Sequence, residues 1–281
     1  MADDFDFKYF RYDPSMVAAV LFIVLFLAIT AIHIYQMIRT RVWIFIPFVI
    51  GGFFEWIGYI GRAICSTETP DWTLGPYIQQ TLLLLIAPAL YAASIYMMLG
   101  RIILLTDGED HSMIPKRWLT KVFVTGDVIS FMMQGAGGGI MSGESISAIH
   151  TGEKIIIGGL VVQLLFFGFF VVTGATFHMR MKRHPTTKIL SESLPWERQL
   201  YALYGASVLI LVRSLFRLIE YAQGNDGYLI SHEVFLYVFD AVLMFGVMAW
   251  LAWIHPSEIT ARLGQGKGRA VRRVVEVYEL V

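Results

Sequence analysis

Charged residues are scarce in this sequence. Asp, Glu, Lys and Arg make up 16 % of its 281 residues, whereas a soluble domain carries about 25 %. Hydrophobic residues account for 56 %, and the formal net charge is zero. A neutral chain lacks the broad basic surface of a nucleic-acid-binding protein, so we expect no nucleic-acid partner. The shortage of charge indicates a membrane protein.

Cysteine and asparagine each occur once. Cys65 has no partner cysteine, so no disulfide can form within the chain. Asn225 is followed by Asp226 and Gly227, which is not an N-glycosylation sequon. The sequence also lacks the GxxxxGK[ST] loop that holds the phosphates of ATP. We expect no cofactor, and any transport should be passive, driven by a gradient, or dependent on a partner.

Apolar segments dominate what is present. A helix needs about 20 mostly apolar residues to cross a bilayer, and it satisfies its own backbone hydrogen bonds there. We therefore predict an all-α, seven-transmembrane-helix bundle within residues 15–255, between an N-terminal segment (1–14) and a basic tail (256–281). The predicted spans lie near residues 15–38, 42–64, 77–104, 118–140, 154–178, 199–222 and 230–254.

Lysine and arginine are concentrated in alternate loops. Sixteen of the 22 basic residues fall in or beside the first, third and fifth loops and the tail, and four fall on the other side. The last two, Arg213 and Arg217, lie within the sixth span. Cytoplasmic loops of membrane proteins are enriched in these residues. The pattern predicts an extracytoplasmic N-terminus and a cytosolic C-terminus.

Ionisable residues lie inside the predicted spans at helical spacing, as in the stripe of Glu55, Tyr59 and Arg62. Such residues are costly in a bilayer and usually face the bundle interior. We predict that they line a hydrated pocket in the outer half of the membrane, with structural ion pairs as the alternative. The candidates for the substrate site or pathway are Glu55, Arg62, Gln80, Asp127, Gln134, Arg213, Arg217, Glu220, Glu233 and Asp240.

These candidates include five acids and three arginines. If all of them are ionised, the surplus of acids predicts either an acid that meets a cationic amine of the substrate or an acid that holds a proton. The fourth span also ends in a glycine-rich string, Gln134–Gly139. Small residues let membrane helices approach closely, and consecutive glycines weaken a helix. The string therefore predicts either tight packing or a hinge.

Four strings resemble a known fungal family. They are EWIGYIGR (residues 55–62), QQTLLLLIAPALYAASIYMMLGR (79–101), GDVISFMMQGAGGG (126–139) and RSLFRLIEYAQGNDGYLISHE (213–233). In this order they resemble the lipid-translocating exporters, or RTA-like proteins, which include sphingoid long-chain-base exporters. The resemblance runs from about Tyr12 to His255. It implies seven helices, the plasma membrane or another cell membrane, resistance to toxic amphiphiles and, in one branch, porphyrin uptake.

We therefore expect a plasma-membrane exporter of lipids or cationic amphiphiles such as sphingoid bases, and not an enzyme. A seven-helix receptor for a lipid-like ligand remains an alternative. A porphyrin transporter and an intramembrane metal hydrolase are less favoured. A hydrolase needs several ligands around one metal, whereas the histidines associated with the spans lie at helix ends. We predict no catalytic or metal-binding residue. These histidines are His33, His178, His232 and His255.

Overall fold

The computed structural model describes residues 10–141, 146–191, 194–224 and 227–263. All regular secondary structure in these ranges is helical, which confirms the all-α prediction. The elements are α1 (Met16–Thr40), η1 (Trp43–Phe45), α2 (Ile46–Thr67), α3 (Leu74–Leu105), η2 (Glu109–His111), α4 (Lys116–Met141), α5 (Ile146–Arg183), α6 (Thr187–Ser191), α7 (Trp196–Ala222), α8 (Glu233–Leu236), η3 (Tyr237–Ala241), α9 (Val242–Trp253) and α10 (Ser257–Leu263).

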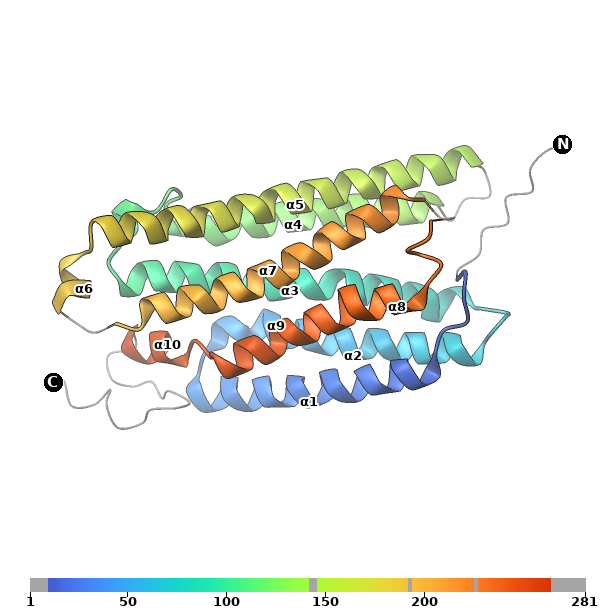
Figure 1. Ribbon diagram of the computed structural model, residues 1–281, viewed down its shortest axis with the longest axis horizontal. Helices are drawn as coiled ribbons and strands as arrows, with labels where there is room; N and C mark the ends of the chain where they lie inside the picture. Colours follow the sequence, from blue (N-terminus) through green and yellow to red (C-terminus); the bar gives the residue numbers. More distant parts are fainter. Residues whose placement is uncertain (1–9, 142–145, 192–193, 225–226, 264–281) are drawn as a thin grey trace.

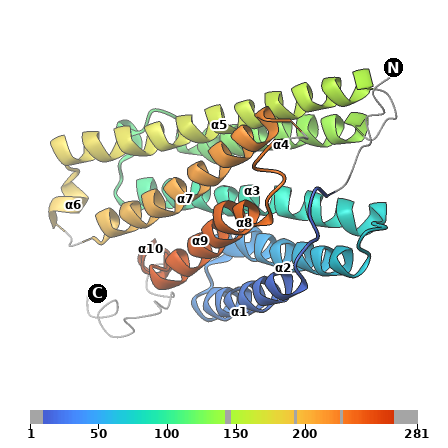
Figure 2. The same ribbon diagram turned by 45° about the vertical axis from the view of Figure 1, so that its right-hand side comes forward.

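The long helices form one bundle with their axes roughly along its length (Figure 1). α4 and α5 pair on one side, α1 and α2 lie on the other, and α3, α7 and α9 run between them (Figures 1 and 2). α7 crosses obliquely, packing on both α5 and α9. Aromatic side chains such as Phe48, Tyr91 and Tyr96 are fully buried in the core. We call the end at which α1 begins the N-terminal end of the bundle.

Within the described ranges, six helical stretches are long and apolar enough to cross a membrane. They cover α1, η1 with α2, α3, most of α5, α7, and α8 through α9. Large apolar side chains face outward from them, including Val17, Leu165 and Val234, which are 80 %, 67 % and 67 % exposed. A lipid environment accommodates such a surface, and water does not. The chain is an integral, multi-pass membrane protein.

α4 is not among these six stretches. Asp127, Gln134 and the glycine-rich end lower its hydropathy. It nevertheless runs beside α5 over most of its length (Figure 1). The seventh expected span is also not one regular α-helix, because the π-helical segment η3 separates α8 from α9. Residues 1–9 and 264–281 of the two expected terminal segments lie outside the described ranges.

The glycine string of α4 belongs to a tight helix contact. α4 continues through Gly139 to Met141, so no break forms there. A Cβ on Gly137 would lie 2.7 Å from the carbonyl oxygen of Gly152 on α5. By contrast, a Cβ on Gly138 would meet no atom within 4 Å. Close packing, rather than a hinge, accounts for Gly137.

Substituting alanine at these neighbouring glycines should have opposite effects on stability. Gly137→Ala forces α4 away from α5, and overpacking of this kind costs about 1–3 kcal/mol, so the thermal unfolding midpoint in detergent should fall. Gly138→Ala is the matched control, because it gains about 1 kcal/mol of helix propensity without a clash. Equal midpoints for the two variants would contradict this account of the contact.

Candidate functional site: a polar pocket at the N-terminal end of the bundle

A cavity of about 90 Å³ lies at the N-terminal end, among α2, α3, α7 and the segment from Leu229 to Asp240. Toward this end α7 diverges from α8 and α9 (Figure 1), and the cavity occupies the space that this divergence opens. Residues just before α1 complete the wall. The lining includes six of the residues predicted from sequence, namely Arg62, Gln80, Arg213, Arg217, Glu220 and Asp240.

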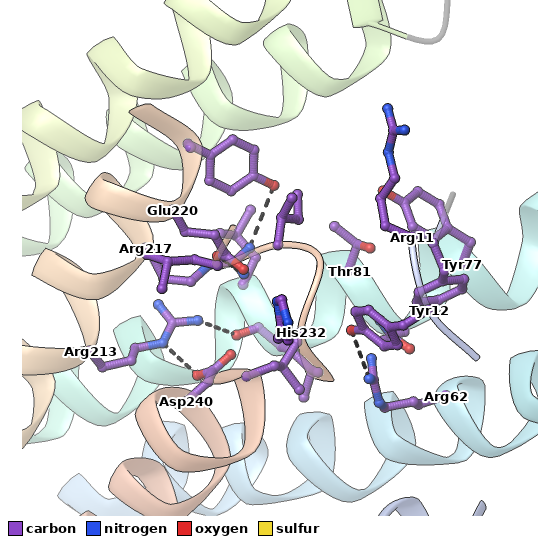
Figure 3. A pocket seen from close by; sticks show the side chains of 18 residues that line it. Arg11, Tyr12, Arg62, Tyr77, Thr81, Arg213, Arg217, Glu220, His232 and Asp240 are labelled. Carbon is purple, nitrogen blue, oxygen red and sulfur yellow. Dashed lines mark hydrogen bonds and ion pairs between the residues drawn. The ribbon is translucent and has the colours of Figure 1, made fainter. Parts of the chain in front are cut away.

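An ion pair joins α7 to η3 at the base of the pocket. The Nε of Arg213 donates to Oδ1 of Asp240 at 2.7 Å, and its Nη2 donates to the Leu84 carbonyl at 2.9 Å (Figure 3). Both charged side chains are almost fully buried. The π-helical turn from Tyr237 to Ala241 shifts the register of the helix around Asp240. Such π-bulges occur frequently at functional sites.

A second ion pair joins α2 to α8. The Nη2 of Arg62 donates to Oε1 of Glu233 at 2.6 Å, and its Nε donates to the Tyr237 hydroxyl at 3.0 Å. Arg62 is completely buried, and its guanidinium lies over the Tyr237 ring at 5.2 Å from the centroid. The third pair lies within α7, where Nη1 of Arg217 donates to Oε2 of Glu220 at 2.6 Å. Each pair therefore holds one arginine against one carboxylate.

The segment before α1 forms a wall of the pocket that sequence analysis missed. The Tyr12 hydroxyl accepts from Nη2 of Arg62 at 2.9 Å (Figure 3), and the backbone amide of Ser15 donates to both oxygens of Glu233. Burial raises the pKa of the Tyr12 phenol above its ordinary value, so the hydroxyl stays protonated. These residues precede the first helix, where helical spacing offers no signal.

Of the other four predicted site residues, three lie outside the pocket and one lies at its edge. Glu233 is held beside the pocket by Arg62, and Glu55 is buried behind the lining, within electrostatic reach of Asp240. Asp127 instead accepts from the Tyr96 hydroxyl at 3.0 Å, in the contact between α3 and α4. Gln134 donates to two side chains in the contact between α4 and α5, and none of the described residues that line the pocket comes from α4. The two side chains that accept from Gln134 are Ser130 and Gln163.

Because several of these carboxyl groups lie outside the pocket, its lining does not have the surplus of acids that the candidate residues have as a group. Both carboxylates in the lining, Glu220 and Asp240, already accept from arginines. Arg11 adds a fourth guanidinium to the wall, and it extends away from the other three (Figure 3). The pocket is thus at least as rich in arginine as in acid. Within the described ranges, no three His, Cys, Asp or Glu side chains gather as metal ligands would.

Comparison with known proteins places this chain in a family. The family model described as "RTA1 like protein" matches residues 48–262. The chain belongs to the RTA1-like family. This match covers the helices that line the pocket, but not the segment before α1 that completes its wall.

Several RTA1-like relatives have names that describe transport. The chain is 39 % identical to "Protoporphyrin uptake protein 1" of Saccharomyces cerevisiae, over 86 % of this chain and 89 % of the relative. It is 34 % identical to "Probable lipid transporter atnI" of Emericella nidulans, over 88 % and 67 %. It is 26 % identical to "Sphingoid long-chain base transporter RSB1" of S. cerevisiae, over 87 % and 72 %. No solved structure matches the chain.

The effects of Arg213 and Asp240 on the stability of the fold should be strongly coupled. Removing one partner leaves a buried charge uncompensated, which costs about 3–5 kcal/mol, whereas replacing both by apolar residues is often neutral. We expect Arg213→Met and Asp240→Leu each to lower the thermal midpoint, and the double variant to recover most of the loss.

The exposed pair between Lys182 and Glu197 provides the control cycle. Its atoms lie 3.5 Å apart and its side chains are 49 % and 44 % exposed, so its coupling should be at most about 1 kcal/mol. Additive losses at Arg213 and Asp240 would show that the two residues do not act as a pair.

Proposed function

We propose that this chain is a membrane transporter of amphiphilic molecules and that their polar head groups enter the pocket. The pocket itself is the observation that carries the proposal. It is a polar, arginine-lined cavity within a bundle whose outer surface is apolar. Ionisable residues inside membrane bundles typically mark substrate or ion pathways. The names of the lipid and sphingoid-base transporters among the relatives support the same function.

We include α4 in the membrane domain, which makes seven spans. Apolar side chains of α4 face outward, as they do on the other spans, and Val128, Ile129 and Met132 are 48 %, 45 % and 71 % exposed. A polar loop helix would not present such a face. Asp127 and Gln134 are buried toward α3 and α5, so they do not oppose insertion of α4 beside those helices.

The proposed topology places the pocket on the extracytoplasmic side. At the opposite end of the bundle lie α6, α10 and the last turn of α1 (Figure 1). Basic residues cluster there, including Arg39, Arg183 and Lys188, and lysine and arginine favour the cytosolic side. A pocket at the extracytoplasmic end suits a plasma-membrane exporter that delivers amphiphiles outward. The sequence contains no GxxxxGK[ST] loop, and we propose transport that is passive, driven by a gradient, or dependent on a partner.

Two substrate classes merit comparison. A sphingoid base is supported by a relative named for it, at 26 % identity. A porphyrin is supported by a more similar relative, at 39 % identity, and by the arginines of the pocket, which can pair with carboxylates. Both are amphiphiles, so the general function does not depend on the choice between them.

Transport can be measured in liposomes that contain the purified chain. A labelled sphingoid base and a dicarboxylic porphyrin should be presented separately, and at least one should cross the bilayer faster than in empty liposomes. Leu165→Ile, on the lipid-facing surface of α5, is a control variant that should retain the rate. If the folded protein moved neither amphiphile, the proposal of transport would be wrong.

A further inference from the structure

The arginines of the pocket have hydrogen-bond donors that no group in the described part of the chain accepts. Nη1 of Arg62, Nη1 of Arg213 and Nε of Arg217 are buried, and none has an acceptor within the described residues. Arg62 and Arg213 are themselves 0 % and 1 % exposed. They reach toward the pocket from opposite sides (Figure 3). Buried donors are nearly always satisfied in proteins, so these three indicate an acceptor that the described residues do not supply.

The carboxylates of the pocket are less available to a ligand. Asp240 and Glu220 each accept a charge-assisted hydrogen bond of 2.7 Å or less from arginine. A cationic ligand would have to compete with these bonds and would leave the arginine donors unsatisfied. Gln80 has an unpartnered Oε1 in the lining, but an amide can turn its NH₂ group toward the cavity instead. The hydrogen-bond chemistry therefore favours an anion.

The size of the cavity restricts which part of a ligand it can hold. Pockets that enclose a drug-sized molecule are typically about 300–1,000 Å³, whereas this one is about 90 Å³. It can accommodate a carboxylate or phosphate but not an acyl chain or a porphyrin ring. Aromatic side chains of Phe10, Tyr12 and Tyr77 stand at its wall, where they can contact the apolar part of a ligand.

We propose that this pocket binds the anionic head group, a carboxylate or a phosphate, of an amphiphile. Arg62 and Arg217 contact the head group from α2 and α7, and Arg213 supplies a third donor from the base. The planar guanidinium suits both oxyanions, because it offers several donors in a fixed arrangement. The identification of this ligand as the transported substrate rests on the proposed function, whereas the binding site does not.

Binding can be measured with amphiphiles that differ only in their head groups. The full chain in uncharged nanodiscs would be titrated with dodecanoate, dodecyl phosphate and dodecylammonium, and with inorganic phosphate alone. We expect the two anionic amphiphiles to bind at least tenfold more tightly than dodecylammonium. Weak binding of inorganic phosphate would show that the apolar chain contributes, while equal binding would indicate a site for the free anion. Tighter binding of dodecylammonium would overturn the proposal.

Variants locate the site. Arg217→Gln should weaken binding of dodecyl phosphate at least tenfold, and Arg217→Lys should restore part of it because the charge returns. Arg101→Gln is the matched control, since Arg101 lies at the far end of α3 beside Thr260. Unchanged affinity in folded Arg217→Gln would refute the assignment. The comparison of head groups in the unaltered chain stands even if an arginine variant does not fold.

The liposome assay keeps the two proposals separate. Selective binding of anionic amphiphiles without transport would support this site and contradict transport. Transport of a sphingoid base without any preference for anionic head groups would support transport and contradict this site.

Discussion

Arginine burial is the constraint on which this end of the bundle depends. Arg62 and Arg213 are 0 % and 1 % exposed, and an uncompensated charge in such a place would cost several kcal/mol. Each therefore has to be met by a carboxylate from the last long helical stretch. Arg62 requires Glu233, and Arg213 requires Asp240. These two pairs hold α2 and α7 against one helix and set the position of the pocket between them.

The two carboxylates are seven residues apart, and the turn between them is π-helical. Seven residues make close to two turns of a regular α-helix, so Glu233 and Asp240 already lie on one face. The η3 segment adds a local change of register at Tyr237, which itself accepts from Arg62. The irregular turn thus carries two polar contacts of the pocket, from Tyr237 to Arg62 and from Asp240 to Arg213. A regular helix would have to place Tyr237 and Asp240 differently relative to α2 and α7.

Much of this arrangement could be predicted from spacing alone. The stripe from Arg213 to Glu220 occupies one helix face, and membrane physics turns such a face inward. Spacing does not tell which inward faces meet, which is why Asp127 and Gln134 were grouped with residues that they do not approach. Tyr12 was missed for a different reason. It lies before the first helix, and its role arises only because Arg62 comes close to it in the folded chain.

Counting charges in the sequence also does not describe the charge of the pocket. The sequence has more candidate acids than arginines, but the fold directs three of the acids into ion pairs. The other two, Glu55 and Asp127, are buried outside the lining. A carboxylate has only oxygen acceptors, whereas a guanidinium has five donors. One ion pair can therefore occupy the hydrogen-bond acceptors of a carboxylate and still leave some N–H donors of its arginine without an acceptor. Arg213 illustrates this, since its bonds to Asp240 and Leu84 still leave Nη1 without an acceptor. The same residue can therefore stabilise the helix contact and bind a ligand, so a structural role for these pairs does not argue against a functional one.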